Sequence, residues 1–250
     1  MQEYEVELKT AGGTLDCFVC HPEEKGPHPG IIFYMDAPGI REELRDMVRR
    51  IAATGYTVLL PNMYYRIGRE NHYGYDRTRT SVDDAERQKM FDCMNTLDNA
   101  MVVEDTAAML DFLRDHDAVA AGPLGCVGYC MSGCYVVSVA AAYPDDFAAI
   151  ASFYGVGIIT EAEDSPHLKA DKIKGELYLA FASDDPYVPA ALLERMPDIF
   201  ANAGIRHRIE IYPETEHGFA FPERQVYVKA AAERHWERLH ALFDENLRRS

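Results

Sequence analysis

The amino-acid sequence predicts an α/β protein built on a mostly parallel, twisted sheet of about seven or eight strands with helices on both faces. Short apolar runs alternate along the chain with longer helical patterns, as expected for strands that are joined by crossover helices. In addition, 48% of the 250 residues are hydrophobic, which supplies enough apolar side chain for one substantial core.

In the first half of the chain, apolar runs bounded by glycine or proline mark the strands. These expected strands are residues 3–9, 15–20, 30–35 and 56–60. An apolar stripe from Leu44 to Ile51 predicts a helix that Gly55 ends, and residues 62–80 are aromatic and basic without a clear period, as in a long surface loop. The expected helices of this half are residues 41–54, 82–94 and 98–115.

The second half repeats the alternation with longer connections. Its expected strands are residues 124–128, 147–153, 176–182 and 207–212. Its expected helices are residues 131–143, 190–203 and 225–248. Because ligands bind at the carboxyl ends of strands in such sheets, the loops that follow these strands are where we expect the functional residues.

Composition narrows the class of partner. The chain has 25 Lys and Arg against 41 Asp and Glu, a net charge of −16 that repels nucleic acid and anionic membrane surfaces. No repeat or Pro/Gly/Ser-rich linker divides it, so we expect residues 1–250 to be a single domain, as a monomer or small homo-oligomer. The first residues lack the pattern of a secretory signal, which favours a cytoplasmic location.

A nucleophile is predicted between the strand at 124–128 and the helix that follows. The segment Gly128-Tyr129-Cys130-Met131-Ser132-Gly133 has the layout of a nucleophile elbow, in which the central residue occupies a strained turn and small neighbours let strand and helix pass closely. The helix N-terminus would favour a thiolate at Cys130 and a developing oxyanion. A buried structural cysteine, or Ser132 as the nucleophile, are the alternatives.

An acid and a base follow in the chain order of hydrolases with such an elbow. Asp184 and Asp185 come directly after the strand at 176–182, and one of them should point at a histidine. His217 comes after the strand at 207–212, whereas the other histidines lie in helices, at element ends or in loops, of which His72 and His167 stay open as alternatives.

The remaining cysteines carry weaker signals. The Cys17 and Cys20 pair has the CxxC spacing but lies in an apolar strand, without a second pair at the distance of a zinc site. Cys126 and Cys134 are expected to be packing residues, and all six cysteines to be reduced thiols.

At these motifs the sequence resembles the dienelactone hydrolase family, the carboxymethylenebutenolidase-like members of the α/β-hydrolase fold with a cysteine nucleophile. The likeness extends over nearly the whole chain. The matching segments are Met35–Gly39, Pro61–Tyr64, Gly128–Gly133, Asp185–Pro189 and His217–Ala220. The resemblance implies an α/β-hydrolase fold and cleavage of a small carboxylic ester or lactone, without a metal or an organic cofactor.

The resemblance also implies individual roles. Cys130 would be the nucleophile, His217 the base and Asp185 the residue that orients it. The backbone N–H groups of Met131 and Ala37 would form the oxyanion hole. A thioester would then form on Cys130 and be released by water that His217 activates.

Other positions depart from the family pattern. Asp36 stands where the family has a glutamate that accepts the thiol proton; a loop aspartate that caps the next helix is the alternative. Phe221 replaces an arginine that holds the substrate carboxylate, Lys89 lies near the position of a second one, and Arg224 is a nearby cation. With Tyr64 in an aromatic loop, these four are the expected substrate contacts, unless the aromatic residues only cover the sheet.

Three alternatives to ester hydrolysis follow from the same residues. Cleavage of a carbon–carbon or carbon–halogen bond is known in related folds, although a dehalogenase needs a carboxylate at the elbow. A non-catalytic ligand-binding homologue would not need Cys130, His217 and Asp185 together. A thiol redox protein would use Cys130 with Cys134 as its resolving partner.

Overall fold

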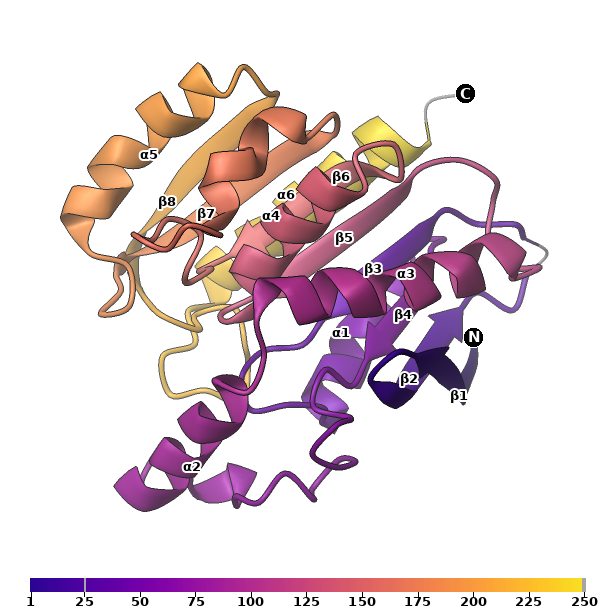
Figure 1. Cartoon of the computed structure of the whole chain (residues 1–250), viewed down its shortest axis with the longest axis horizontal. Helices are drawn as coiled ribbons and strands as arrows, with labels where there is room; N and C mark the ends of the chain where they lie inside the picture. The colour runs from indigo at the N-terminus through magenta and orange to yellow at the C-terminus, as the bar shows by residue number, and fades with distance from the viewer. Residues whose placement is uncertain (25, 249–250) are drawn as a thin grey trace. The chain divides into compact units, whose positions relative to one another are not determined.

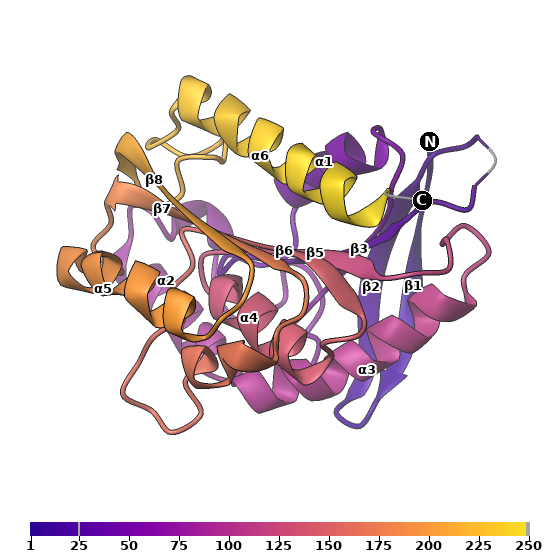
Figure 2. The same cartoon turned by 90° about the horizontal axis from the view of Figure 1, so that it is seen from above.

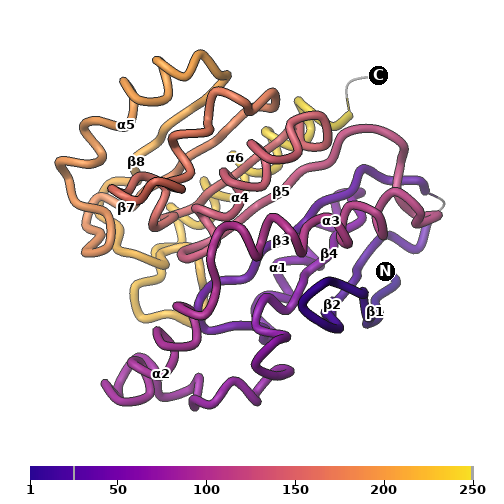
Figure 3. The backbone as a smooth tube through the Cα atoms, in the orientation of Figure 1, coloured from indigo at the N-terminus to yellow at the C-terminus, as the bar shows by residue number. Residues whose placement is uncertain are grey.

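The structure is a computed structural model that describes residues 1–24 and 26–248. Its residues cluster into two compact units, Met1–Ala121 and Gly122–Ser250. Figure 1 labels the helices and strands of both units, and the tube in Figure 3 follows the chain through them. The single-domain organisation of residues 1–250 stays a prediction.

The first unit contains a sheet with the strand order β1-β2-β4-β3. These strands are β1 (Gln2–Thr10), β2 (Gly13–His21), β3 (Gly30–Tyr34) and β4 (Thr57–Pro61). β1 and β2 form an antiparallel hairpin with one-to-one register, β2 pairs antiparallel with β4, and β3 pairs parallel with β4. All five residues of β3 and of β4 are buried, as continuous apolar runs predict for inner strands.

Helices cover both faces of this sheet. They are α1 (Glu42–Ala52) and α3 (Asn99–Asp115). A third helix, α2 (Asp84–Met94), lies away from the strands and contacts the 3-10 turn η1 (Arg77–Arg79) in the long loop before it (Figure 1). Figure 2 shows α1 on one face of the strands and α3 on the other. The predicted stripe from Leu44 to Ile51 is buried, and Asp83 and Asp98 cap the starts of α2 and α3 through their side chains.

The second unit contains the strands β5-β6-β7-β8 in chain order, and each neighbouring pair is parallel. They are β5 (Leu124–Tyr129), β6 (Phe147–Phe153), β7 (Glu176–Asp184) and β8 (His207–Glu216). The helices are α4 (Ser132–Ala142), α5 (Ala190–Asn202) and α6 (Lys229–Leu247), with a 3-10 segment, η2 (Pro166–Lys172). α6 lies on one face, and α4 and α5 lie on the other (Figure 2).

The expected fold class is confirmed, because the described chain has eight strands whose only antiparallel pairings involve β2. The element bounds agree to within about two residues, apart from the C-terminal end of β8 and the start of the final helix. That helix begins at Lys229 rather than near residue 225, since Val228 still has an extended backbone. No helix in the described residues is long and apolar enough to cross a membrane. A cytoplasmic location and the oligomeric state stay predictions.

Candidate active site

Cys130 occupies a strained turn between β5 and α4. Its backbone φ is +55°, in the left-handed region that residues with a side chain rarely adopt. The turn is held by backbone hydrogen bonds: the Cys130 carbonyl accepts from the N–H groups of Gly133 at 3.1 Å and Val156 at 3.0 Å. Met131 follows at the N-cap of α4, so its N–H lies at the positive end of the helix dipole.

The glycines around Cys130 are required by close backbone contacts. A Cβ atom on Gly128 would lie 2.4 Å from the Ser132 carbonyl oxygen, and one on Gly133 would lie 2.2 Å from Gly155 Cα. Neither distance leaves room for a methyl group, since β5, α4 and the segment after β6 meet here. The glycines predicted from the sequence therefore have a steric cause.

His217 is joined to Asp185, one of the two predicted acids. Nδ1 of His217 donates to Oδ2 of Asp185 over 2.8 Å, and the backbone N–H of Tyr187 donates to the other carboxylate oxygen over 2.9 Å. Side chains of both partners are nearly inaccessible, with 8% exposure for His217 and 0% for Asp185. Asp184, in contrast, is exposed at the end of β7.

The environment of His217 stabilises its charged form. Burial alone would lower the pKa of His217, but the negative charge of Cys130 and the hydrogen bond to Asp185 outweigh it and raise the pKa from 6.5 to about 9. The rings of Tyr154 and Tyr187 pack edge-on against the imidazole at centroid distances of 5.1 and 4.8 Å. The surroundings of His217 therefore favour the imidazolium.

The rival nucleophiles are less suited to the role. Ser132 is completely buried at the start of α4. The Cys134 thiol donates to the Met131 carbonyl over 3.1 Å, and burial raises its pKa to about 12. Burial likewise raises the pKa values of Cys17, Cys20 and Cys126, and all six cysteines are free, as expected.

In the first unit, Asp36 is buried and paired with Arg41. Nη2 of Arg41 donates to Asp36 over 3.0 Å, and the same guanidinium donates to Glu43 over 2.7 and 2.9 Å. Burial would lower the pKa of Arg41, but the two carboxylates outweigh it and raise that pKa. The alternative in which Asp36 caps the next helix is wrong, because the N-cap is Arg41 without a side-chain cap and the carboxylate of Asp36 binds the guanidinium. A role of Asp36 in accepting the thiol proton stays a prediction.

The two unit 1 residues expected to contact substrate have other partners. Tyr64 is buried, and its hydroxyl donates to the Ala37 carbonyl over 2.9 Å. Lys89 is 54% exposed and forms an ion pair with Glu86 over 2.7 Å. Contact of either with a substrate stays a prediction.

The two residues of the second unit that are expected to contact substrate, Phe221 and Arg224, lie together. Phe221 is fully buried and packs edge-on against Tyr129, the neighbour of Cys130, at a centroid distance of 5.3 Å. The guanidinium of Arg224 lies over the Phe221 ring, 5.3 Å from its centroid. Arg224 is thus next to the position from which the family arginine is missing, although the sequence alone did not show that the two side chains touch.

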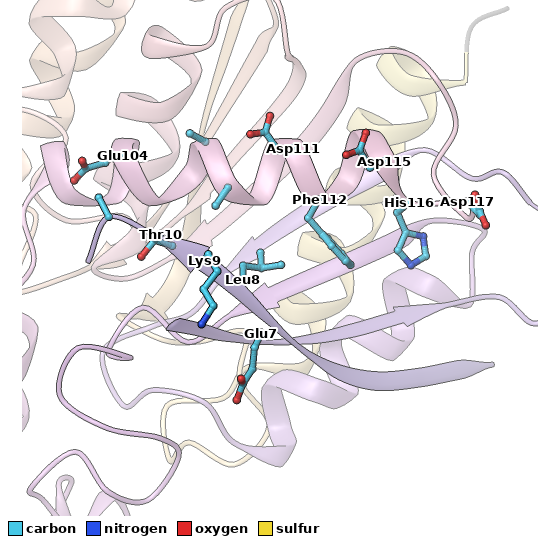
Figure 4. A pocket seen from close by; sticks show the side chains of 13 residues that line it. Glu7, Leu8, Lys9, Thr10, Glu104, Asp111, Phe112, Asp115, His116 and Asp117 are labelled. Atoms are coloured by element: carbon cyan, nitrogen blue, oxygen red, sulfur yellow. The ribbon is translucent and has the colours of Figure 1, made fainter. Parts of the chain in front are cut away.

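A groove of about 800 Å³ runs between β1 and α3, well separated in sequence from the motifs above. Figure 4 shows Leu8 on the strand and Phe112 pointing from the helix toward it. None of the residues predicted for the active site lines this groove. Among the described residues, no group of three or more His, Cys, Asp or Glu side chains could hold a metal ion.

Comparisons with known proteins point to one family. The sequence profile of the dienelactone hydrolase family matches residues 15–247. A carboxymethylenebutenolidase of Pseudomonas putida is 26% identical over 88% of this chain and 87% of its own length. A Synechocystis protein provisionally given the same name is 28% identical, over 92% of both chains.

A solved structure supports the fold. The crystal structure of a provisionally named dienelactone hydrolase from Klebsiella pneumoniae superposes with a TM-score of 0.82 at 24% identity, covering 97% of this chain and 98% of its own. The predicted α/β-hydrolase fold is therefore confirmed.

Proposed function

The chain belongs to the dienelactone hydrolase family, hydrolases that act on lactone esters, and we propose that it cleaves a small ester or lactone through Cys130, His217 and Asp185. One observation carries the proposal: a buried imidazole, hydrogen-bonded to a buried carboxylate, has a pKa that the charge of Cys130 raises to about 9. Nucleophile, base and orienting acid are the three parts that a covalent hydrolase needs.

In the first half of the reaction, the Cys130 thiolate attacks the carbonyl carbon of the ester. A carbon–sulfur bond forms, and the carbonyl electron pair moves onto oxygen, where the N–H groups of Met131 and Ala37 stabilise the negative charge. The carbon–oxygen bond then breaks as the oxyanion collapses. The leaving alkoxide takes the proton from Nε2 of the His217 imidazolium, and a thioester is left on Cys130.

The second half requires His217 to stay neutral after it has given its proton to the leaving alkoxide. The negative charge of Cys130 raises the pKa of His217, while burial lowers it. In the thioester the sulfur carries no charge, so that contribution disappears and the pKa falls. Neutral His217 then takes a proton from water, the hydroxide attacks the thioester, and the departing thiolate restores the ion pair.

The substrate is proposed to be uncharged near the reacting carbonyl. Phe221 stands where the family has a carboxylate-binding arginine, and Lys89 is already paired with Glu86. We also propose His217 rather than Asp36 as the main proton carrier, because the Asp36 carboxylate is already bound by the guanidinium of Arg41.

The test compares wild type, Cys130→Ala and Ser132→Ala with p-nitrophenyl acetate, a simple lactone and dienelactone. We expect wild type and Ser132→Ala to hydrolyse the first two, Cys130→Ala to be inactive, and iodoacetamide to abolish wild-type activity. Activity in Cys130→Ala would show that the nucleophile is misassigned. A wild type inert with all three substrates would favour the ligand-binding alternative.

A further inference from the structure

The carbonyl oxygen of Ala37 accepts two hydrogen bonds from tyrosine side chains. The hydroxyl of Tyr64 donates to it over 2.9 Å, and that of Tyr75 over 3.1 Å. The single proton of Tyr75 is shared with the Pro38 carbonyl, whose oxygen also lies 3.1 Å from the Tyr75 hydroxyl. Both phenol rings are buried, and burial raises the pKa of Tyr75 above its ordinary value of 10.0, so this hydroxyl stays a donor throughout the working pH range.

The peptide between Asp36 and Ala37, which carries the Ala37 N–H, is fixed by a turn. The backbone N–H of Gly39 donates to the Asp36 carbonyl over 3.0 Å. Because the Asp36–Ala37 peptide is planar and trans, its N–H points opposite to this carbonyl, away from the inside of the turn. Gly39 has a φ of +83°, and a Cβ there would lie 2.6 Å from the ring of Tyr73, so the turn and the tyrosines constrain one another.

We propose that Tyr64 and Tyr75 are positioning residues for ester hydrolysis, which hold the peptides around Ala37 so that its N–H keeps the direction needed to stabilise the oxyanion. The inference rests on the proposed function, in which Ala37 supplies one of the two oxyanion donors. Donors fixed in advance stabilise a transition state better than donors that must reorient, because no reorganisation accompanies the reaction.

This assignment differs from a role in binding substrate. A hydroxyl that donates to a backbone carbonyl has used its single proton and cannot donate to a ligand at the same time. Loss of such a hydroxyl should leave substrate affinity nearly unchanged and slow the chemical step. It should also leave alkylation of Cys130 unchanged, because attack on iodoacetamide develops no oxyanion.

The chain offers a matched control in Tyr73. This ring lies between the other two, with centroid distances of 5.2 Å to Tyr64 and 6.0 Å to Tyr75. Its hydroxyl, however, donates to the side chain of Asn62 over 3.0 Å. Tyr73→Phe thus removes a buried hydroxyl from the same aromatic cluster without touching the Ala37 carbonyl.

The experiment measures kcat and KM for p-nitrophenyl acetate, the rate of Cys130 alkylation by iodoacetamide and the Tm in four variants: Tyr64→Phe, Tyr75→Phe, the double variant and Tyr73→Phe. We expect kcat to fall roughly tenfold in each single variant at Ala37 and roughly a hundredfold in the double variant. KM and the alkylation rate should stay within about twofold of wild type, and Tyr73→Phe should keep its kcat.

Three results would overturn the inference. An unchanged kcat in the double variant would show that the hydroxyls do not position the donor. A rise in KM alone would indicate direct substrate contact, and a parallel loss of hydrolysis, alkylation and Tm would indicate a general role in folding. If wild type hydrolyses no ester while iodoacetamide still alkylates Cys130, the proposed function itself fails and this inference falls with it.

Discussion

The turn at Cys130 and the turn at Ala37 are held in place by different forces. Around Cys130, glycines let backbone segments approach so closely that a single methyl group would not fit, and the turn is fixed by sterics and backbone hydrogen bonds. Around Ala37, side chains of Tyr64, Tyr75 and Arg41 donate to successive backbone carbonyls. The turn at Cys130 depends on residues without side chains, and the turn at Ala37 depends on hydrogen bonds from side chains.

This difference predicts different responses to mutation. A steric constraint fails at once when an atom is added, because neighbouring backbone cannot move without shifting a strand or helix. A constraint made of several hydrogen bonds weakens by steps, each worth about 0.5–1.5 kcal/mol. The turn at Cys130 should therefore tolerate almost no added atom, whereas the turn at Ala37 can be weakened one hydrogen bond at a time.

A large effect on activity is expected when the acid that orients His217 is changed, since the charge and the tautomer of the imidazole depend on this carboxylate. Asp185→Asn keeps the shape of the side chain but removes its charge and favours the wrong imidazole tautomer. We expect kcat to fall by roughly a thousandfold or more, as in other triads. Steady-state hydrolysis of p-nitrophenyl acetate measures this, and a loss of less than tenfold would contradict the role of Asp185.

At the turn around Ala37, we expect a large loss of stability from Arg41→Met. Asp36 and Glu43 would be left as buried carboxylates without their cation, which typically costs about 3–5 kcal/mol. Urea unfolding of the variant measures the loss. Neutralising the carboxylates as well, in Arg41→Met/Asp36→Asn/Glu43→Gln, should recover part of it; no recovery would mean that the ion cluster is not the cause.

A smaller loss of stability is expected from Gly133→Ala at the elbow. The added methyl group would overlap Gly155 Cα and the Ser152 side chain, and such overpacking costs about 1–3 kcal/mol. Activity should fall together with stability, since the shift displaces Cys130. Thermal unfolding and ester hydrolysis of the same preparation test this, and an unchanged Tm would show that the segment after β6 gives way easily.

The pKa of His217 should depend on the charge of Cys130. Below a pH of about 9 its imidazole is charged in the free protein, because the negative charge of Cys130 raises its pKa. Alkylation of Cys130 with iodoacetamide removes that charge, so the pKa of His217 should fall. Histidine NMR against pH measures both forms, and equal pKa values would rule out the change of protonation proposed for the second half of the reaction.

The smallest effect is expected from Cys134→Ser. The thiol of Cys134 is buried with a pKa of about 12, so it is a poor partner for thiol–disulfide exchange. The rate of ester hydrolysis should stay within about twofold of wild type, because Cys134 is not one of the proposed reacting groups. A disulfide between Cys130 and Cys134 in peroxide-treated wild type, found by mass spectrometry, would revive the redox alternative.

The sequence was most informative where local geometry demands a residue type. The glycines around Cys130, the apolar stripe of α1 and the order of Cys130, Asp185 and His217 could all be read from spacing, because each reflects a constraint within one or two elements. The choice of Asp185 over Asp184 needed the family resemblance, and the structure agrees with it because Asp185 alone is buried against His217.

The side-chain contacts around Ala37 were harder to predict from the sequence. Tyr75 lies in a loop without periodicity, so nothing in the spacing showed that its hydroxyl returns to a carbonyl 38 residues earlier. Arg41 stood next to a predicted helix, and Asp36 was predicted to accept the thiol proton, with capping of that helix as the alternative; neither prediction included a bond to a guanidinium. Contacts between a long loop and a distant turn depend on how the loop folds back, which hydrophobic patterns do not encode.

The left-handed backbone of Cys130 limits which residues can replace this proposed nucleophile during evolution. Residues branched at Cβ are strongly disfavoured at such a φ, so threonine and valine are excluded from the position. Cysteine and serine each carry a single γ atom and meet the same backbone requirement. The scaffold can therefore alternate between sulfur and oxygen chemistry without rebuilding the turn, and the neighbouring imidazole decides which of the two is efficient.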